Sequence, residues 1–488
     1  MTAIKQQPLF EIFPVGQKII FTVFNNAVSS KFNVKYVAEV HIRDNKSIDI
    51  DSGSHLVATF KTTPNNAGVG IFDLRSLLES YVSSDNLGFV NSFGLASNYK
   101  NVAYSETTPH PIHVIDKYCP NTNSARWFRV KFTVEGASTA TAAVQEIANS
   151  TQKTVPFLFF NGVLQRTDYL TQGIVNAAGS IVAGINYGYD LQKNLFYGGE
   201  EPMYGKSKFL TNAPTTQYAD LDDYGTVAFL TFAPTSSDRV KFIKYNFYDS
   251  GGNSLGTANI EVKFSNGFYS NSQAFSSNKI CYAGVFPANL RNHNTTFQGL
   301  VTAGTIQGGY YTFIMENHAG SQGQEYRINI NCPNEKGYES IRLCWLNQWG
   351  VWDYYTFKQK SVRSTTTNRT TYTQLGGTWN EDSYVINGFK GGQKNFRVNS
   401  TERISVNTDF VTESEAIWFE ELINSQEVYI IKGFDATETA PYNTITNKYV
   451  EPVLITSSNY VRKTIANDKL MQYTFEMERN KTQQTQTS

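Results

Sequence analysis

The stretch FNVKYVAEVHI, residues 32–42, decides the fold class because apolar and polar side chains alternate along it. The apolar positions of one parity are Phe32, Val34, Tyr36, Ala38, Val40 and Ile42. Successive side chains of a β-strand point to opposite faces of its sheet, so this period of two is typical of a strand with one buried face. The stretch predicts a long strand in a sheet that covers an apolar core.

The segments around this strand extend the pattern. QKIIFTVF (17–24) and LVATFKT (56–62) are expected to be neighbouring strands, and alternation returns in RWFRVKFTVE (126–135). In FDLRSLLESYV (72–82) the period changes, and apolar residues spaced three and four apart predict a short amphipathic helix with Asp73 as its N-cap. The apolar positions of this helix are Leu74, Leu77, Leu78, Tyr81 and Val82.

The composition favours a modular protein built of β-sheets. A chain of 488 residues is too long for one ordinary core, given domains of about 100 to 200 residues. Aromatic residues make up 14% of it, and Thr, Val, Ile and Tyr recur in short runs, which suits half-buried strands. The 42 Lys and Arg residues balance 42 Asp and Glu residues, so no net field favours nucleic acid or an anionic membrane as partner.

The N-terminal sequence and the cysteines indicate the cellular compartment in which the chain is expected to fold. Residues 1–17, MTAIKQQPLFEIFPVGQ, have no basic stretch followed by an apolar one, so they do not read as a secretory signal, and folding in a cytoplasm is expected. No apolar run approaches the roughly 18 residues that span a bilayer. The four cysteines lack the CxxC spacing of zinc sites and are expected to be reduced and mostly buried.

The stretch CWLNQWGVWDYYTF, residues 344–357, holds three of the six tryptophans. Three interpretations compete: a platform that stacks on sugars, an interface between subunits, and the core of a β-hairpin. Strand alternation does not bury Trp349, which is expected at the tip of a hairpin. Trp349, Trp352 and Tyr354 are therefore the candidate residues for contact with another subunit or a glycan ligand. The alternative is that Trp349 packs back on its own sheet.

Paired landmarks predict an internal repeat. FFNGV (159–163) resembles WLNQWGV (345–351), and Asn161-Gly162 suits a type I′ hairpin turn because both positions tolerate a positive φ. GIFD (70–73) likewise resembles GVFP (284–287). We therefore expect two related sandwich units, the first of which carries extra Ala- and Thr-rich sequence.

The expected fold is mainly β: tandem Ig-like β-sandwich domains with short amphipathic helices, followed by a C-terminal module of α+β or β-sandwich type. The expected parts are a first sandwich (1–170), an irregular insertion or linker (171–221), a second sandwich related to the first (222–361), a C-terminal β-rich module with one buried helix (362–480) and a disordered tail (481–488).

Two segments of the C-terminal module carry specific expectations. Thr412 and Glu415 have the spacing of a capping box at the start of a helix. The apolar stripe of that helix is expected to consist of Ile417, Trp418, Leu422 and Ile423. The basic, Thr-rich residues 358–377 are expected to be an exposed linker strand or an arm packed on a neighbouring subunit.

The residue types that serve in catalysis and metal binding form no recognisable motif in the sequence. His110, His113 and Asp116 are close in sequence, but the prolines beside them favour an extended loop and no fourth ligand is evident, so no metal is expected. DIDSG (49–53) begins like a calcium loop, yet its twelfth position is Phe60 rather than Glu, which excludes an EF-hand. There is no GxSxG, Walker or GxGxxG motif. We expect no catalytic residues, no cofactor and no enzymatic activity.

Three segments resemble virion-associated proteins of tailed bacteriophages that infect Bacteroidetes-type hosts. SEAIWFEELINSQEVYII (414–431), together with residues 451–480, is similar to their C-terminal module, and IRLCWLNQWGVWDYYTF (341–357) resembles a hairpin common in them. Residues 13–23 and 58–82 fit their first β-domain. The resemblance implies a tail, neck or baseplate component built of tandem Ig-like sandwiches, and it transfers no catalytic residue.

The expected function is therefore that of a non-enzymatic structural subunit of a tail, neck or baseplate ring, located in the virion after assembly in the host cytoplasm. Its partners would be other virion proteins and copies of itself, without nucleic acid and without membrane insertion. The alternative is a tail-tip or fibre adhesin that binds a host receptor or glycan through aromatic loops. A third interpretation, a bacterial surface adhesin, is disfavoured by the missing export signal.

Overall fold

The computed structural model describes residues 2–8, 10–88, 110–115, 117–163, 169–175, 181–189, 191, 194, 207–231, 239–262, 280–320, 322–332, 337–432, 450–457 and 471–479. In these ranges the protein is mainly β, as the sequence predicts, with short helices between the strands. Contacts divide the chain into a first unit (1–333, 346–354 and 433–446) and a second unit (334–345, 355–432 and 447–488). None of the helices in the described ranges has the length and apolarity needed to cross a membrane.

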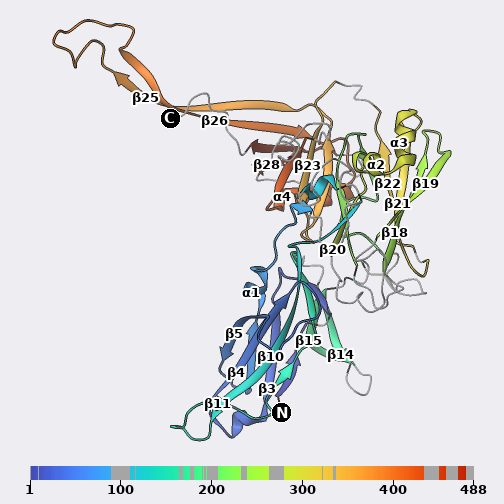
Figure 1. The fold of residues 1–488 in the computed structure, drawn as a ribbon, viewed down its shortest axis with the longest axis vertical. Helices are drawn as coiled ribbons and strands as arrows, with labels where there is room; N and C mark the ends of the chain where they lie inside the picture. Colours follow the sequence, from blue (N-terminus) through green and yellow to red (C-terminus); the bar gives the residue numbers. More distant parts are fainter. Residues whose placement is uncertain are drawn as a thin grey trace. The chain divides into compact units, whose positions relative to one another are not determined.

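The first unit starts with a β-sandwich, drawn in blue and cyan in Figure 1. Its smaller sheet has the order β1 (Thr2–Gln6), β3 (Ile20–Asn25), β6 (Val69–Asp73). Its larger sheet has the order β2 (Ile12–Pro14), β13 (Phe157–Phe160), β10 (Ala125–Ala137), β4 (Phe32–Arg43), β5 (Leu56–Thr62), with β11 (Gln145–Glu146) and β12 (Gln152–Lys153) beside β10. The ring of Phe132 on β10 lies 5.8 Å from Phe21 on β3 and 5.7 Å from Phe72 on β6, so both sheets share one core.

The strand that decides the fold class buries the predicted face except at its first residue, and Val37 and His41 on the opposite face are buried as well. On β4, five of the six positions of one parity are buried: Val34, Tyr36, Ala38, Val40 and Ile42. Phe32, the first of them, is exposed, because β4 begins there and its register partner Ala137 follows an irregularity in the pairing.

The helix predicted after β6 is shorter than its apolar pattern. The helix α1 spans Arg75–Glu79, and Leu74 rather than Asp73 is its N-cap. Asp73 Oδ1 still accepts a hydrogen bond from Arg75 N at 3.1 Å, and it also accepts one from Ile19 N at 3.1 Å on the neighbouring strand segment. Leu74 and Leu78 are buried, whereas Tyr81 is exposed because the chain has left the helix before it.

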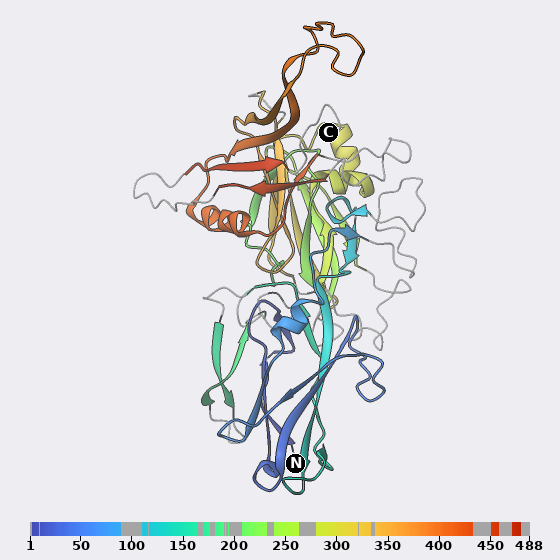
Figure 2. The same ribbon diagram turned by 90° about the vertical axis from the view of Figure 1, so that its left-hand side faces the viewer.

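A second pair of sheets follows in the first unit, and its strands from residue 216 onward are drawn in green to yellow in Figure 2. The larger one has the order β16 (Thr216–Ala219), β22 (Tyr326–Ile330), β21 (Tyr310–Asn317), β18 (Val240–Tyr248), β19 (Ser254–Glu261). The smaller one has the order β17 (Thr226–Leu230), β20 (Ile280–Gly284), β9 (Tyr118–Pro120). Helices α2 (Pro287–His293) and α3 (Thr295–Thr302) connect β20 to β21, and the 3₁₀ helices η1 (Asn26–Ser29) and η3 (Ile112–Val114) lie in earlier connections.

The two larger sheets have the same strand order. Numbered along the chain, their five main strands run first, fifth, fourth, second, third in both sheets, and the first strand is parallel to the fifth in both. In each case a strand of the smaller sheet, β6 or β20, is followed directly by a helix, α1 or α2. GIFD (70–73) forms the last four residues of β6, whereas GVFP (284–287) begins at the last residue of β20 and ends at the first residue of α2. Both sequences thus lie at a junction of strand and helix. That the two sandwiches are related units stays a prediction.

The second pair of landmarks does not correspond in this way. The counterpart of β13, which precedes Asn161 and Gly162, is β22 and not the strand that precedes Trp349. Neither Asn161 nor Gly162 has a positive φ, so the predicted type I′ turn is wrong. The reason is the position of β13, which lies between the antiparallel β10 and the parallel β2 and therefore needs no tight hairpin partner.

The region predicted as an irregular insertion contains strands. β14 (Tyr169–Val175) and β15 (Ile181–Tyr189) pair with each other, and β16 belongs to the second five-stranded sheet. Glycine and asparagine residues interrupt the alternation of apolar and polar side chains in these strands, so the sequence pattern did not predict them. A further short pair is β7 (Leu87–Gly88) with β8 (His110–Pro111). The predicted disordered tail, residues 481–488, lies outside the described residues.

A seven-stranded sheet dominates the C-terminal part of the chain. Its order is β24 (Trp352–Phe357), β23 (Ile341–Leu346), β27 (Val428–Ile431), β28 (Val450–Ile455), β29 (Thr474–Arg479), β26 (Gly392–Asn407), β25 (Val362–Gln374). The hairpin of β23 and β24 was predicted inside the second sandwich, but its strands belong to this sheet. The sequences of β23 and β24 do not show which sheet the two strands join, because β23 pairs with β27, whose residues are far away in the sequence.

The helix α4 (Glu413–Asn424) confirms the predicted capping box and corrects the predicted stripe. Thr412 Oγ1 accepts a hydrogen bond from Glu415 N, and Glu415 Oε2 accepts one from Thr412 N at 2.7 Å. The buried side chains are Ala416, Trp418, Phe419 and Leu422, whereas Ile417 is exposed. Phe419 takes the place that was assigned to Ile417, since it contacts the rings of Tyr355 at 4.9 Å and Phe475 at 5.6 Å.

The strands β25 and β26 extend beyond the rest of the sheet as a two-stranded ribbon (Figures 1 and 2). Their pairing runs from Val362 and Ser405 at the base to Gln374 and Gly392 at the far end. Beyond residue 403 β26 pairs with β29, so the outer part of the ribbon has only its own two strands. The segment predicted as an exposed strand or arm, 358–377, is half of this ribbon.

Candidate functional site

The three residues predicted to contact a subunit or a ligand lie on the hairpin between β23 and β24. Asn347 N donates to Val351 O at 2.8 Å, and Gly350 N donates to Asn347 O at 2.9 Å. Gly350 has a φ of 68°, which glycine adopts without steric cost. The interpretation of this stretch as a β-hairpin is confirmed.

All three residues are buried. The exposed fraction is 2% for Trp349, 2% for Trp352 and 3% for Tyr354. The structure therefore favours the interpretation in which Trp349 packs within its own chain, since these rings could stack on a sugar only after the hairpin moved. Contact with a partner through these residues stays a prediction.

Polar side chains of the first unit hold two of these rings in place. Trp352 Nε1 donates to Asp85 O at 2.7 Å. The Tyr354 hydroxyl lies 2.8 Å from His113 Nδ1 and 2.9 Å from Thr226 Oγ1. The His113 ring also meets Trp352 edge-on at 5.0 Å between centroids. His113 is thus part of a packed structural network, and its predicted companions, the His110 side chain and Asp116, lie outside the described residues.

Asp85 is the centre of this network. Its Oδ1 accepts hydrogen bonds from Thr122 N at 3.0 Å, Thr122 Oγ1 at 2.9 Å and Asn123 N at 2.6 Å, and its Oδ2 accepts one from Tyr282 Oη at 3.1 Å. The residue is fully buried, and these donors take the place of the water that a carboxylate needs. Burial raises the pKa of Tyr282 well above its usual value, so the phenol remains a donor.

The buried thiol near this network is not activated. Burial raises the pKa of the Cys281 thiol well above its usual value, which makes it a poor nucleophile. All four cysteines are free thiols, and Cys332 is the exposed one. Among the described residues there is no group of His, Cys, Asp and Glu side chains that could hold a metal ion.

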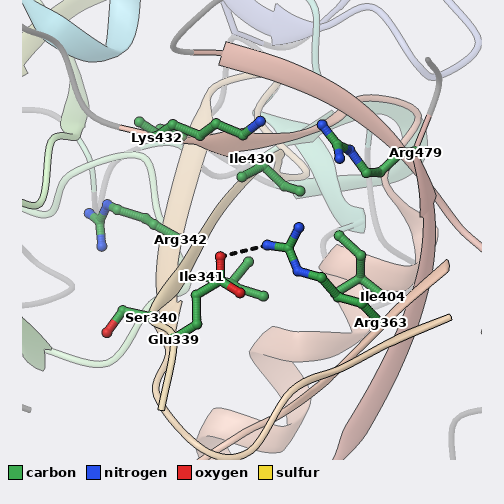
Figure 3. Close-up of a pocket in the computed structure, with 10 residues that line it drawn as sticks. Glu339, Ser340, Ile341, Arg342, Arg363, Ile404, Ile430, Lys432 and Arg479 are labelled. Carbon is green, nitrogen blue, oxygen red and sulfur yellow. Dashed lines mark hydrogen bonds and ion pairs between the residues drawn. The ribbon is translucent and has the colours of Figure 1, made fainter. Parts of the chain in front are cut away.

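The second unit contains a small polar hollow at the base of the ribbon. It encloses about 220 Å³ and is lined by the residues that Figure 3 draws, among them the buried isoleucines Ile341, Ile404 and Ile430 and several charged side chains. We refer to it as the basal hollow. The charged lining residues are Glu339, Arg342, Arg363, Lys432 and Arg479.

Ion pairs order the charged side chains of the basal hollow. Arg363 Nη2 lies 2.5 Å from Glu339 Oε1, the pair marked in Figure 3. Arg479 binds Glu402 at 2.7 Å and Glu451 at 2.5 Å, and Lys432 also contacts Glu451. Burial raises the pKa of Glu451, but the hydrogen bonds from Arg479 and Lys432 outweigh it and hold that pKa below its usual value.

The cationic residues that line the hollow are engaged with other groups. Arg363, Lys432 and Arg479 pair with the carboxylates Glu339, Glu402 and Glu451. Arg342 is buried, and its Nη1 donates to Thr356 Oγ1 at 2.7 Å.

The two most exposed large apolar side chains among the described residues of the second unit, Ile386 and Phe389, lie at the far end of the ribbon. We call residues 375–391 the ribbon tip. Its exposed large side chains are Leu375, Trp379, Tyr384, Val385, Ile386 and Phe389. Ile386 and Phe389 are 79% and 81% exposed, whereas the aromatic residues predicted as contacts are buried.

The ribbon tip is nevertheless ordered by its own hydrogen bonds. Val385 N donates to Thr378 Oγ1 at 2.8 Å, and Thr378 N donates to Val385 O at 3.2 Å. The rings of Trp379 and Tyr384 meet edge-on at 5.3 Å, and Trp379 Nε1 donates to Gly376 O at 2.7 Å. Sequence reasoning missed these residues. The signal was present as a cluster of large apolar side chains between the glycine pairs 376–377 and 391–392.

Comparisons with known proteins assign no family to this chain. No family model matches it, and no curated protein matches it. Among solved structures, a crystal structure of a Salmonella alpha-2-macroglobulin is similar at 8% sequence identity with a TM-score of 0.18. The match covers 84% of this chain, which spans 21% of the length of that chain.

Proposed function

We propose that this protein is a non-enzymatic structural subunit of a bacteriophage tail, neck or baseplate ring, which assembles with copies of itself and with other virion proteins. The resemblance of residues 341–357 and 414–431 to segments of virion-associated proteins supports the proposal. The single observation that carries it is the ribbon, which exposes apolar side chains at a distance from any core.

The ribbon has the properties of an assembly element. A two-stranded ribbon is marginally stable in water unless other strands or a partner cover it. Within the part of the chain that the structure describes, no third strand pairs with either edge of its outer part, and its exposed side chains include Tyr372 and Phe396 on the strands as well as the ribbon tip. A free edge together with exposed aromatic residues is typical of a surface that binds another protein.

The test is the mass of the full chain in solution, measured by light scattering over a range of concentrations. The variant replaces residues 375–391 with an Asn-Gly turn, and the control replaces the exposed Leu56 with Ser. We expect the full chain and the control to form defined oligomers and the variant to remain monomeric. A full chain that is monomeric at every concentration, alone and with its virion partners, would contradict the proposal.

The tip also favours a second candidate function, recognition of a host receptor or glycan. The exposed pair Trp379 and Tyr384 presents two rings of the kind that stack on sugars. A pull-down on intact host cells distinguishes the two functions. Binding of the isolated protein to cells, lost on Trp379→Ala and retained in Trp379→Phe, would place receptor recognition first. Oligomers that do not bind cells would support the ring subunit.

A further inference from the structure

We propose that the edge strand β25 pairs with β25 of a second copy of this chain, antiparallel and with Asn368 on the two-fold axis. The inference rests on the proposed function, because it specifies one contact through which copies would assemble. The observation behind it is the edge of β25. This strand is the last one of the seven-stranded sheet, and among the described strands it pairs with β26 alone.

The edge of β25 lacks the features that keep edge strands apart. An unpaired edge is a template for another chain, and native proteins protect it with proline, lysine, bulges or a covering loop. β25 has 13 residues, none of them proline, glycine, lysine or a carboxylate, and all except Gln374 are exposed. At its one register shift, between Thr370 and Thr371, the extra residue is Phe396 on β26. β25 therefore offers a long, regular and uncovered edge.

The other edge of the ribbon is less suited to pairing. The outer part of β26, residues 392–402, contains the bulge at Phe396 and the cations Lys394 and Arg397. A bulge bends the strand and leaves a residue unpaired, and charged side chains oppose the approach of a like edge. Of the two edges of the ribbon, that of β25 is therefore the one that fits a second copy.

The sequence of β25 is complementary to itself in this register. Asn368 is the middle residue of the strand, so an axis at Asn368 pairs the two copies along their whole length. The pairs across the axis would be Asn368 with Asn368, Thr367 with Arg369, Thr366 with Thr370, Thr365 with Thr371, Ser364 with Tyr372, Arg363 with Thr373 and Val362 with Gln374. Pairs of threonines stabilise neighbouring strands, and no two like charges lie directly opposite each other.

The arginines are compatible with this register. The two copies of Arg369 would be diagonal neighbours about 7 to 8 Å apart, a separation at which physiological salt screens much of their repulsion. An axis at Arg369 would instead set this residue against its own copy, and an axis at Thr366 would set it against Arg363. Charge therefore disfavours these two shifted registers.

The contact is isologous, because the same strand forms both of its surfaces. It closes after two copies, so it joins subunits in pairs and leaves other surfaces to complete a ring. In such a pair each ribbon tip continues past Val362 of the second copy, where its apolar side chains add contact to the paired edges. This arrangement agrees with the monomer that we expect when residues 375–391 are replaced.

Disulfide trapping tests the register. Asn368→Cys places a thiol on the axis opposite its own copy, and Asn399→Cys is the matched control, because Asn399 pairs with Asn368 inside the ribbon and is equally exposed. Both variants are made in the full chain with Cys332→Ser, since Cys332 is the exposed thiol among the described cysteines. Diamide, which takes up the two electrons of disulfide formation, is added at a concentration of protein at which the wild type associates. We expect a covalent dimer from Asn368→Cys and only a trace from Asn399→Cys.

A charge at the same two positions gives an independent measurement. Asn368→Lys sets two ammonium groups against each other on the axis and should weaken association, measured by light scattering, by about tenfold or more. Asn399→Lys adds the same charge one strand away from the contact and should leave association nearly unchanged.

The outcomes separate this inference from the proposed function. Equal trapping at both positions, no trapping at either while the wild type associates, or normal association of Asn368→Lys would overturn the pairing of β25. The proposed function would survive each of these results, because copies could then assemble through the ribbon tip alone. A full chain that is monomeric by itself at every concentration would also overturn the pairing, and the proposed function would then be decided by the measurement with its virion partners.

Discussion

The indole nitrogen of Trp352 donates a hydrogen bond to the backbone oxygen of Asp85 at 2.7 Å, although the two residues are 267 positions apart in the chain. Asp85 in turn binds Thr122, Asn123 and Tyr282 through its carboxylate. The hydrogen bond of Trp352 therefore connects the hairpin to a network that joins the segments around residues 85, 122 and 282 of the first unit. The aromatic stretch 344–357 thus takes part in the packing of the first unit.

Replacing Trp352 with Phe should destabilise the protein by about 1 to 3 kcal/mol, because the buried oxygen of Asp85 loses its donor and the smaller ring leaves space. The measurement is the free energy of unfolding in urea. Trp379→Phe, on the exposed ribbon tip, is the matched control and should change it by less than about 0.5 kcal/mol. Equal effects at both positions would argue against the role of the Trp352 hydrogen bond.

Gly350→Ala should destabilise the hairpin by about 3 kcal/mol or more, since a side chain there meets two obstacles. The φ of Gly350 is 68°, and a Cβ atom would lie 1.4 Å from the backbone oxygen of Asn161. Gly53 is the matched control: its φ is 69°, but its Cβ would have open space. Gly53→Ala should cost only about 1 to 2 kcal/mol, the cost of the left-handed backbone alone. Thermal unfolding of both variants separates the two contributions.

Stability should fall at mildly acidic pH through His293. Burial lowers the pKa of this imidazole from 6.5 to about 4, against a smaller opposite effect of the hydrogen bond to Asn289 O. Above about pH 6.5 the group is neutral in both the folded and the unfolded chain, so it has no effect on the free energy of unfolding. Between 6.5 and about 4 the unfolded chain binds a proton that the folded chain does not, and the free energy of unfolding decreases as the pH falls.

The measurement is urea unfolding at several pH values between 7 and 4, roughly the range in which histidines titrate. His293→Gln should flatten part of this dependence. His41, whose pKa burial also lowers, should account for a further part, so His41→Gln is the comparison. An unchanged pH dependence in the His293 variant would show that this imidazole is accessible to protons in the folded state.

In the second unit, Leu422→Ala should cost about 2 to 5 kcal/mol, because Leu422 is fully buried on α4. Ile417→Ala on the same helix should change the free energy of unfolding by less than about 0.5 kcal/mol, because Ile417 is exposed. Chemical denaturation monitored by tryptophan fluorescence reports both, since Trp418 lies on this helix. Comparable losses would mean that Ile417 is covered in solution, for example by a second copy.

Local patterns in the sequence were sufficient for individual elements. The alternation in residues 32–42 predicted β4 and its buried face, because a strand presents every second side chain to the core regardless of its partners. The capping box at Thr412 was also predictable, since its hydrogen bonds join residues three positions apart. At Ile417 the sequence correctly predicted a helix but not which residues other elements cover. The spacing of apolar residues shows that a side of the helix is apolar, and it cannot show whether that whole side is covered.

The sequence by itself determined that this chain forms sheets, where its strongest strands lie and that similar sequences recur at GIFD and GVFP. Only the tertiary structure decided that the hairpin at Trp349 is buried, that its strands join the C-terminal sheet, and that the exposed aromatic residues lie on the ribbon tip. The physical reason is that periodicity reports which side of an element is apolar. Whether that side is covered depends on pairings such as β23 with β27, which link residues remote in sequence.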